Sequence, residues 1–363
     1  MEGPLAVAEA LLVHPTAPYH EGLVAEHCLG FARDRGLTGS TDAAGNVLVR
    51  YGDGDAPLVL VAHLDHPGFV VDAVAGGQAS MTFHGGLGAA HALEGSPVAF
   101  FRPGHDEPVG RGALVSATGA GGRLTGGAAE VLDGDATTGG IAMWDFPAFD
   151  LADGRITGRV CDDLLGVAAI LACLEELQAR RPDATVWGLL TRAEEVGFLG
   201  AIEAIRLGTV PPSASVLSLE CSKALPSAPQ GDGVIVRVGD RMSIFAPGLT
   251  ESLRVAADAV ARRDPTFRYQ RRLMDGGACE ATAFCASGYR ASGLAVPLGN
   301  YHNASDEGIG VAAEHVLVDD WLAEVALLVE LGCDPALLDE ATPEQPAWLL
   351  ERAATARATL GAA

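Results

Sequence analysis

The apolar and polar positions of this chain follow two different patterns. In its first and last parts, continuous apolar runs of strand length stand between segments in which apolar residues recur at helical spacing. Residues 57–62 form such a run, and a strand that is apolar at every position is typical of a sheet covered on both faces. The predicted strands are 46–51, 57–62, 185–191, 216–219 and 292–297, and the predicted helices are 20–35, 164–179, 199–207, 251–262 and 314–331, with a helical tail from Pro335.

The middle of the chain has no helical pattern. Short β-prone pieces at 80–84, 98–102, 113–117 and 141–144 are separated by glycine-rich turns, which is typical of a small all-β module. We therefore predict a discontinuous α/β domain made of residues 1–69 and 156–363. A β-rich domain at 70–155 would be inserted into it, leaving and re-entering at the edge of a shared sheet.

Composition narrows the classes of protein to which the chain can belong. Apolar residues make up 48% of its 363 positions, and 24 Lys and Arg stand against 47 Asp and Glu, a net charge of -23. Such a surface repels nucleic acid and anionic lipid. The longest apolar run, 164–174, is too short to span a bilayer. The negative charge and the short apolar runs therefore indicate a protein that binds neither nucleic acid nor membrane. Seven dispersed cysteines without a CxxC pair, together with an N-terminus that lacks a basic start, indicate a cytoplasmic protein.

Potential metal ligands end or follow the predicted strands. Sites in open α/β sheets gather outside the carboxyl ends of the strands, so side chains placed there are expected to converge. Asp162, which begins the sequence Asp-Asp just before the helix at 164–179, adds a further carboxylate. The residues at the strand ends are His63, Glu194, Glu195, Glu220 and His302.

Imidazoles and carboxylates together are the ligands that borderline divalent cations prefer. If one carboxylate bridges two ions, five side chains provide three ligands to each. The first ion would take His63, Asp162 and Glu220, and the second Asp162, Glu195 and His302. A water between the ions would be the nucleophile, with Glu194 as general base that passes the proton to the leaving amine. Asp65 would hold the far nitrogen of His63. We expect zinc, with cobalt and manganese as alternatives.

The ordered segments AHLDHPG, CDD, AEEVGFLGA, SLE and YHNASDE resemble those of the co-catalytic zinc exopeptidases. The resemblance covers residues 5–331 and is closest to the M42 aminopeptidases, the glutamyl or deblocking and tetrahedral aminopeptidase group. A β module in the 99-residue gap between His63 and Asp162 is the M42 arrangement. The resemblance implies a mixed-sheet zinc-exopeptidase-like domain and an inserted oligomerisation domain. It also implies a homo-oligomer, from dimer to dodecamer, that removes N-terminal residues from peptides.

The chain departs from that pattern at three places. Glu220 stands where M42 members usually have Asp, His66 where they have Glu, and residues 275–280 replace a Gly-Gly-Thr-Asp-Ala loop. His66 is close enough to the site to contact substrate, and a purely structural role is the alternative. Asp163 is expected to cap the helix that follows. Two other functions remain open: a metal-dependent amidohydrolase or deacylase acting on a small N-acyl metabolite, and a non-catalytic oligomeric relative.

Overall fold

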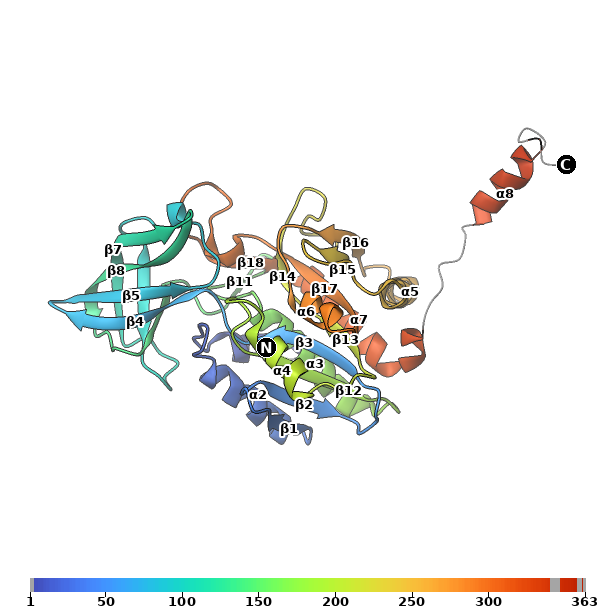
Figure 1. Cartoon of the computed structure of the whole chain (residues 1–363), viewed down its shortest axis with the longest axis horizontal. Coiled ribbons are helices and arrows are strands. Elements are labelled where there is room, and N and C mark those ends of the chain that lie inside the picture. The colour runs from blue at the N-terminus through green and yellow to red at the C-terminus, as the bar shows by residue number, and fades with distance from the viewer. Residues whose placement is uncertain (1–2, 340–346, 358–360, 362–363) are drawn as a thin grey trace.

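A computed structural model describes residues 3–339, 347–357 and 361. The predicted α/β fold is confirmed: a large mixed sheet packed between helices forms the body, and a small β-barrel lies at one end, on the left of Figure 1. Among the described residues, none of the helices combines the length and the apolar character needed to cross a bilayer.

The main sheet joins nine strands of the described chain in the order β1-β2-β12-β3-β13-β17-β15-β16, with β14 paired to β17. Its four central strands, β12, β3, β13 and β17, are parallel to one another, whereas β2 and β15 flank them in antiparallel pairing. The strands are β1 Thr38–Thr41, β2 Val47–Tyr51, β3 Leu58–His63, β12 Val186–Thr191, β13 Ser215–Ser218, β14 Cys221–Lys223, β15 Val234–Asp240, β16 Tyr269–Met274 and β17 Arg290–Leu298.

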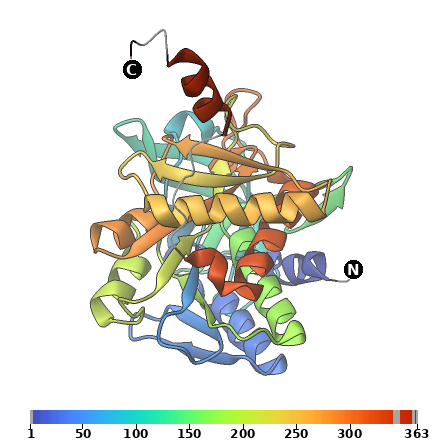
Figure 2. The same cartoon turned by 90° about the vertical axis from the view of Figure 1, so that its right-hand side faces the viewer.

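Helices cover both faces of this sheet, which explains why β3 is apolar throughout. Its alternate residues point to opposite faces. Leu60 and Ala62 pack in the core that contains α1, α3 and α7, whereas Val59 and Val61 pack in the core beneath α4 and α6. Figure 2 looks onto the side where α5 crosses the front of the molecule. The helices are α1 Pro4–Leu12, α2 Gly22–Asp34, α3 Leu164–Arg180, α4 Leu199–Leu207, α5 Pro247–Arg263, α6 Glu280–Ala286, α7 Val318–Cys333 and α8 Ala347–Ala356.

The middle of the chain folds into a closed barrel in the order β4-β5-β8-β7-β6-β9. Phe69 packs edge-to-face against Phe83 and Trp144 in its core. A separate three-stranded sheet, β10-β11-β18, joins the barrel's exit to the body. The bounds are β4 Gly68–Ala75, β5 Gln78–His84, β6 Pro97–Phe101, β7 Gly110–Ala120, β8 Arg123–Gly134, β9 Ile141–Trp144, β10 Asp150–Ala152, β11 Arg155–Gly158 and β18 Glu314–Leu317, with 3-10 turns η1 Ala89–His91, η2 Tyr301–Asn303 and η3 Pro335–Leu338.

The predicted helix at 314–331 is wrong at its start. Residues Glu314–Leu317 form β18, which pairs with β11, and the helix begins only at Val318. The first turn of an amphipathic helix and a short half-buried strand are hard to distinguish by period alone. The prediction also omitted α1 and α6, the main-sheet strands β1, β14, β15 and β16, and the strands β4, β8, β10 and β11 outside that sheet. Residues 340–346, 358–360 and 362–363 of the predicted helical tail lie outside the described residues.

The inserted barrel is attached at an interior strand of the main sheet. It leaves after β3, which is an interior strand with β12 on one side and β13 on the other. The chain returns through β11, outside the main sheet. Because β3 ends at His63, the barrel is attached directly at the edge of the sheet where the predicted ligands lie.

Candidate metal centre

The predicted ligands come together at one edge of the main sheet. His63 ends β3, Glu194 and Glu195 follow β12, Glu220 follows β13, and the loop after β17 carries His302. These four strands are parallel neighbours, so their carboxyl ends meet at the same edge. Asp162 reaches the same place from the segment between β11 and α3. All six side chains are at least nine-tenths buried or line the cleft above this edge.

The two imidazoles present the same nitrogen to the centre. His63 Nδ1 donates to the carbonyl oxygen of Asp65 at 3.0 Å, and His302 Nδ1 donates to the carbonyl oxygen of Gly86 at 2.5 Å. A carbonyl can only accept, so these contacts place a proton on Nδ1 and leave Nε2 directed inward. Such a contact at the far nitrogen is the usual second partner of a metal-binding histidine.

Asp162 lies between the two imidazoles. Its Oδ1 is 3.7 Å from His63 Nε2, and its Oδ2 is 3.4 Å from His302 Nε2. Ligand atoms of His63, Asp162 and Glu220 lie within 4.8 Å of one another, as do those of Asp162, Glu195 and His302. These are the two ligand sets expected from the sequence, and the longer side chain at position 220 reaches its set. A third such set joins His63, Glu194 and Glu195.

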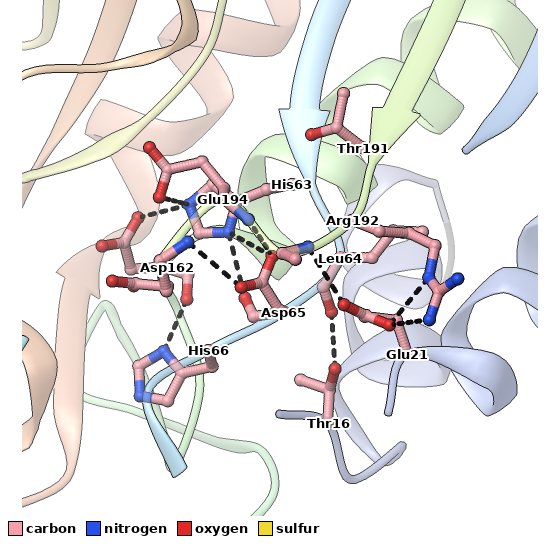
Figure 3. Close-up of polar contacts among 12 residues, drawn as sticks. Thr16, Glu21, His63, Leu64, Asp65, His66, Asp162, Thr191, Arg192 and Glu194 are labelled. Atoms are coloured by element: carbon pink, nitrogen blue, oxygen red, sulfur yellow. Dashed lines mark hydrogen bonds and ion pairs between the residues drawn. The ribbon is translucent and has the colours of Figure 1, made fainter. Parts of the chain in front are cut away.

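Asp65 contributes differently from the expected contact with His63. Its carboxylate accepts the backbone N–H groups of Glu194 and Glu195 at 2.9 and 3.1 Å, whereas its Oδ1 is 3.7 Å from His63 Nδ1 (Figure 3). Asp65 therefore fixes the turn after β12 that carries both glutamates. On the other side of that turn, Glu21 pairs with Arg192 at 2.8 Å and accepts the N–H of Ala193 at 3.0 Å.

The charges of these groups perturb one another strongly. Burial by itself would raise the pKa of Asp162, but His302 and His63 hold it well below the usual range. Burial raises the pKa of Glu194 well above its usual value. Burial and the neighbouring Asp162 raise the pKa of Glu220 to about 8. The cluster thus concentrates more negative charge than its own imidazoles neutralise, which favours bound cations.

The donor set fits a pair of divalent cations. The two inward imidazole nitrogens and the carboxylates of Asp162, Glu195 and Glu220 provide nitrogen and oxygen ligands of the type that zinc binds. Glu220 Oε1 is buried and has no hydrogen-bond partner in the described part of the chain. A buried carboxylate oxygen without a partner is costly, and a cation in this position would satisfy it.

Comparison with known proteins identifies the family of this chain. Residues 128–308 match the family model described as M42 glutamyl aminopeptidase. The chain belongs to the M42 peptidase family. Members of this family are metal-dependent hydrolases of peptide bonds, and this chain is a peptide-bond hydrolase.

Solved structures share the fold of this M42 chain. An aminopeptidase from Desulfurococcus kamchatkensis is 20% identical, with a TM-score of 0.75 over 93% of this chain and 96% of its own. A TET aminopeptidase from a marine-sediment thaumarchaeote is 18% identical, with a TM-score of 0.77 over 93% and 98%. The TET1 peptidase of Pyrococcus horikoshii, which can assemble into a tetrahedron or a large octahedral shell, is 18% identical, with a TM-score of 0.74 over 91% and 99%.

A buried carboxylate that the sequence did not reveal binds the backbone of two segments that carry candidate ligands. Glu314 is fully buried on β18, and its Oε2 accepts the N–H groups of Cys161 and Asp162 at 2.7 and 3.1 Å. Its Oε1 accepts the N–H of His302 at 2.8 Å. Glu314 thereby ties together two segments that carry ligands. The sequence pattern predicts a helix at this position and gives no signal for this role of Glu314.

His66 lies beside Asp162 but does not line the cleft. It is fully buried, with Nδ1 2.6 Å from the carbonyl oxygen of Asp162 and Nε2 3.1 Å from Asn303 Oδ1. Of the two roles considered for His66, the structural one matches this position. Asp163 occupies the N-cap position of α3 as expected, but its side chain makes no capping hydrogen bond.

The cleft above the centre has a volume of about 780 Å³ and is bounded by both the body and the barrel. Gly276, Gly277 and Ala278 line it, so part of the altered loop at 275–280 does face the site. Glu280 at the end of that loop instead points into the core, where it accepts the hydroxyl of Thr191 at 2.5 Å.

Proposed function

We propose that the chain is a two-metal aminopeptidase that removes N-terminal residues from peptides. The metals would be held by His63, Asp162, Glu195, Glu220 and His302. The observation that carries the proposal is the position of Asp162, which presents one oxygen to each inward imidazole nitrogen. Bound divalent cations at such a centre acidify water and polarise a carbonyl oxygen.

Glu194 is the proposed general base and acid. It lines the cleft, and its Oε2 lies 3.9 Å from His63 Nε2, beside the ligands. A carboxylate whose pKa is raised by burial can accept a proton from water and return it to the leaving amine near neutral pH. Asp65 would act through the backbone by fixing the turn that orients Glu194.

The preferred N-terminal residue would be acidic. Beside the cleft lies a cavity of about 100 Å³ that shares Glu220, Tyr301 and the 276–278 segment with it. Arg237 on β15 lines this cavity and is only 2% exposed. Its Nε and Nη1 have no hydrogen-bond partner among the described residues. Lys223 adds a second positive charge to the lining.

A buried guanidinium without a partner is unfavourable, so a ligand that supplies one is bound in preference to one that does not. The carboxylates of the centre would not pair with Arg237, because two bound divalent cations would already balance their charge. A glutamyl or aspartyl side chain at the substrate's N-terminus would provide the missing carboxylate.

The catalytic part of the proposal is tested with Glu194→Gln in the zinc-, cobalt- or manganese-loaded enzyme. We expect turnover of aminoacyl-anilides to be lost while the metal content measured by elemental analysis stays at that of the wild type. Substantial remaining activity would refute the assignment of Glu194. Hydrolysis of N-acetyl amino acids alone, with no aminoacyl-anilide cleaved by the wild type, would indicate a deacylase instead.

The preference is tested by comparing glutamyl- and leucyl-anilides with Arg237→Met. Leaving a buried carboxylate unpaired costs about 3 kcal/mol, so kcat/KM for the glutamyl substrate should fall about 100-fold. The leucyl substrate should change by only a few-fold. Lys223→Met is the matched control, because that side chain is 57% exposed and its loss should matter far less. Equal losses on both substrates would contradict the role of Arg237.

Self-assembly through the barrel is part of the proposal. The Pyrococcus relative assembles into large shells, and this chain's barrel exposes Leu93, Leu132 and Val74. Contiguous exposed apolar patches are typical of surfaces covered by another chain, and the proposal takes these side chains as part of such a patch. Light scattering on the full chain should report a multiple of the 37.2 kDa protomer, and Leu132→Asp should reduce it. A monomeric wild type would refute this part.

A further inference from the structure

The inserted barrel reaches one of the two imidazoles of the centre. The loop between β5 and η1 places the carbonyl oxygen of Gly86 2.5 Å from His302 Nδ1. His63 is different, because its Nδ1 bonds to Asp65 within its own segment of the body. The orientation of the His302 ring is therefore set by the barrel, whereas that of His63 is not.

A second contact joins the barrel to the loop that carries His302. His91 Nδ1 in η1 donates to the carbonyl oxygen of Gly310 at 2.9 Å, and Gly310 belongs to the segment that follows His302. This loop needs support, because Asn300, His302 and Asn303 all have left-handed backbone conformations with φ of 55°, 55° and 59°. Such conformations are unfavourable for non-glycine residues and persist only where surrounding contacts hold them.

The barrel loop is itself firmly attached to the barrel. Leu87 packs in the barrel core, and its carbonyl oxygen accepts the N–H of Leu124 at 2.8 Å. The N–H of Ala89 donates to the carbonyl oxygen of Gly122 at 3.0 Å. The β7–β8 hairpin therefore carries the loop, and any shift of the barrel relative to the body moves Gly86 relative to His302.

We infer that the inserted barrel positions His302 and thereby sets the affinity of the second metal site, formed by Asp162, Glu195 and His302, but not that of the first. The inference rests on the proposed function in taking these residues as ligands. Its physical basis is that an acceptor on the far nitrogen fixes the tautomer and the direction of a ligating imidazole and raises its basicity.

Two glycines of the same loop provide a matched test. Gly86 lies outside the left-handed region, so alanine fits its backbone, but the added Cβ would lie 3.3 Å from His302 Nδ1 and 3.4 Å from its Cε1. The ring would have to move by a few tenths of an ångström. Gly88 has φ of -66°, and a Cβ there meets only His91 Cδ2 at an ordinary 3.4 Å. Gly88→Ala is therefore the control for Gly86→Ala.

The readout is metal affinity, measured by titrating zinc into the metal-stripped full chain in the presence of a competing chelator. Gly86→Ala should weaken the second site about 10- to 100-fold and leave the first unchanged. His91→Ala, which removes the other barrel contact without touching His302, should weaken the same site by a smaller factor. Gly88→Ala should match the wild type.

Two results would overturn the inference: wild-type affinities at both sites in Gly86→Ala, or an equal loss at both sites. Titration needs no turnover, so this outcome is independent of the catalytic test. A wild type that binds two ions but cleaves no aminoacyl-anilide would refute the proposed function and leave this inference standing.

Discussion

Replacing Glu314 by Gln is expected to destabilise the protein although it changes a single atom. The carboxylate accepts three backbone N–H groups, two on Oε2 and one on Oε1. An amide has only one oxygen, so its NH2 group must face at least one of these donors. In the less damaging orientation, the oxygen faces Cys161 and Asp162, and the N–H of His302 loses its acceptor.

The magnitude follows from that one lost contact. A hydrogen bond to a charged group contributes about 1.5–3 kcal/mol, and a buried donor left unpaired costs about 1–3 kcal/mol. We therefore expect Glu314→Gln to lower the free energy of unfolding by about 2–4 kcal/mol. Urea unfolding of the metal-stripped protein measures this without a contribution from bound metal.

Glu307→Gln is the matched control, because Glu307 is an exposed carboxylate in the loop that follows His302. Exposed substitutions of this kind usually change stability by less than about 0.5 kcal/mol. If Glu314→Gln fell within that same range, the reasoning that Glu314 holds the two ligand-bearing segments together would be refuted.

Three further predictions concern the surroundings of the centre. Burial raises the pKa of Glu280 to about 7, so the native state binds its proton more tightly than the unfolded chain does. Its contribution to the free energy of unfolding of the metal-stripped protein should therefore fall by about 3 kcal/mol between pH 4.5 and 7. Glu280→Gln should not show this fall, and parallel pH profiles of stability for the wild type and the variant would contradict the reasoning. Asp65→Asn keeps only one acceptor for the amides of Glu194 and Glu195, and kcat should fall about 10- to 100-fold with little change in KM; a change confined to KM would argue against a positioning role. Removing metal with a chelator should lower the thermal unfolding temperature of the wild type, since bound ions stabilise only the folded state; an unchanged temperature would count against tight binding.

The candidate site residues could be grouped from the sequence because most of them are tied to a local feature. His63 ends an apolar strand, Glu194 and Glu195 follow another, and Glu220 follows a third. Strands that are apolar throughout predict a covered parallel sheet, and in such a sheet the carboxyl ends lie at one edge. The approximate position of the inserted β module followed in the same way from a change of pattern along the chain.

The sequence pattern did not reveal the partners of those ligands. Glu314 lies 152 residues from Asp162, and Gly86 lies 216 residues from His302. Alternation along a strand indicates which residues are buried, but not which distant backbone group a buried carboxylate or carbonyl will meet. The contact of Gly86 uses only a main-chain oxygen, so no side chain could have signalled it.

What the sequence by itself predicted, then, is the set of candidate metal ligands and the sheet edge where they gather, because both depend on local patterns. Only the tertiary structure decided that the side chain of Asp65 holds a turn while its main-chain carbonyl holds the His63 imidazole, and that Glu314 joins two segments that carry candidate ligands. It also decided that Nε and Nη1 of Arg237 lie beside the cleft without a hydrogen-bond partner among the described residues. Hydrogen-bond partners and unpaired charges depend on the relative positions of segments far apart in the chain, and packing of the whole molecule sets those positions.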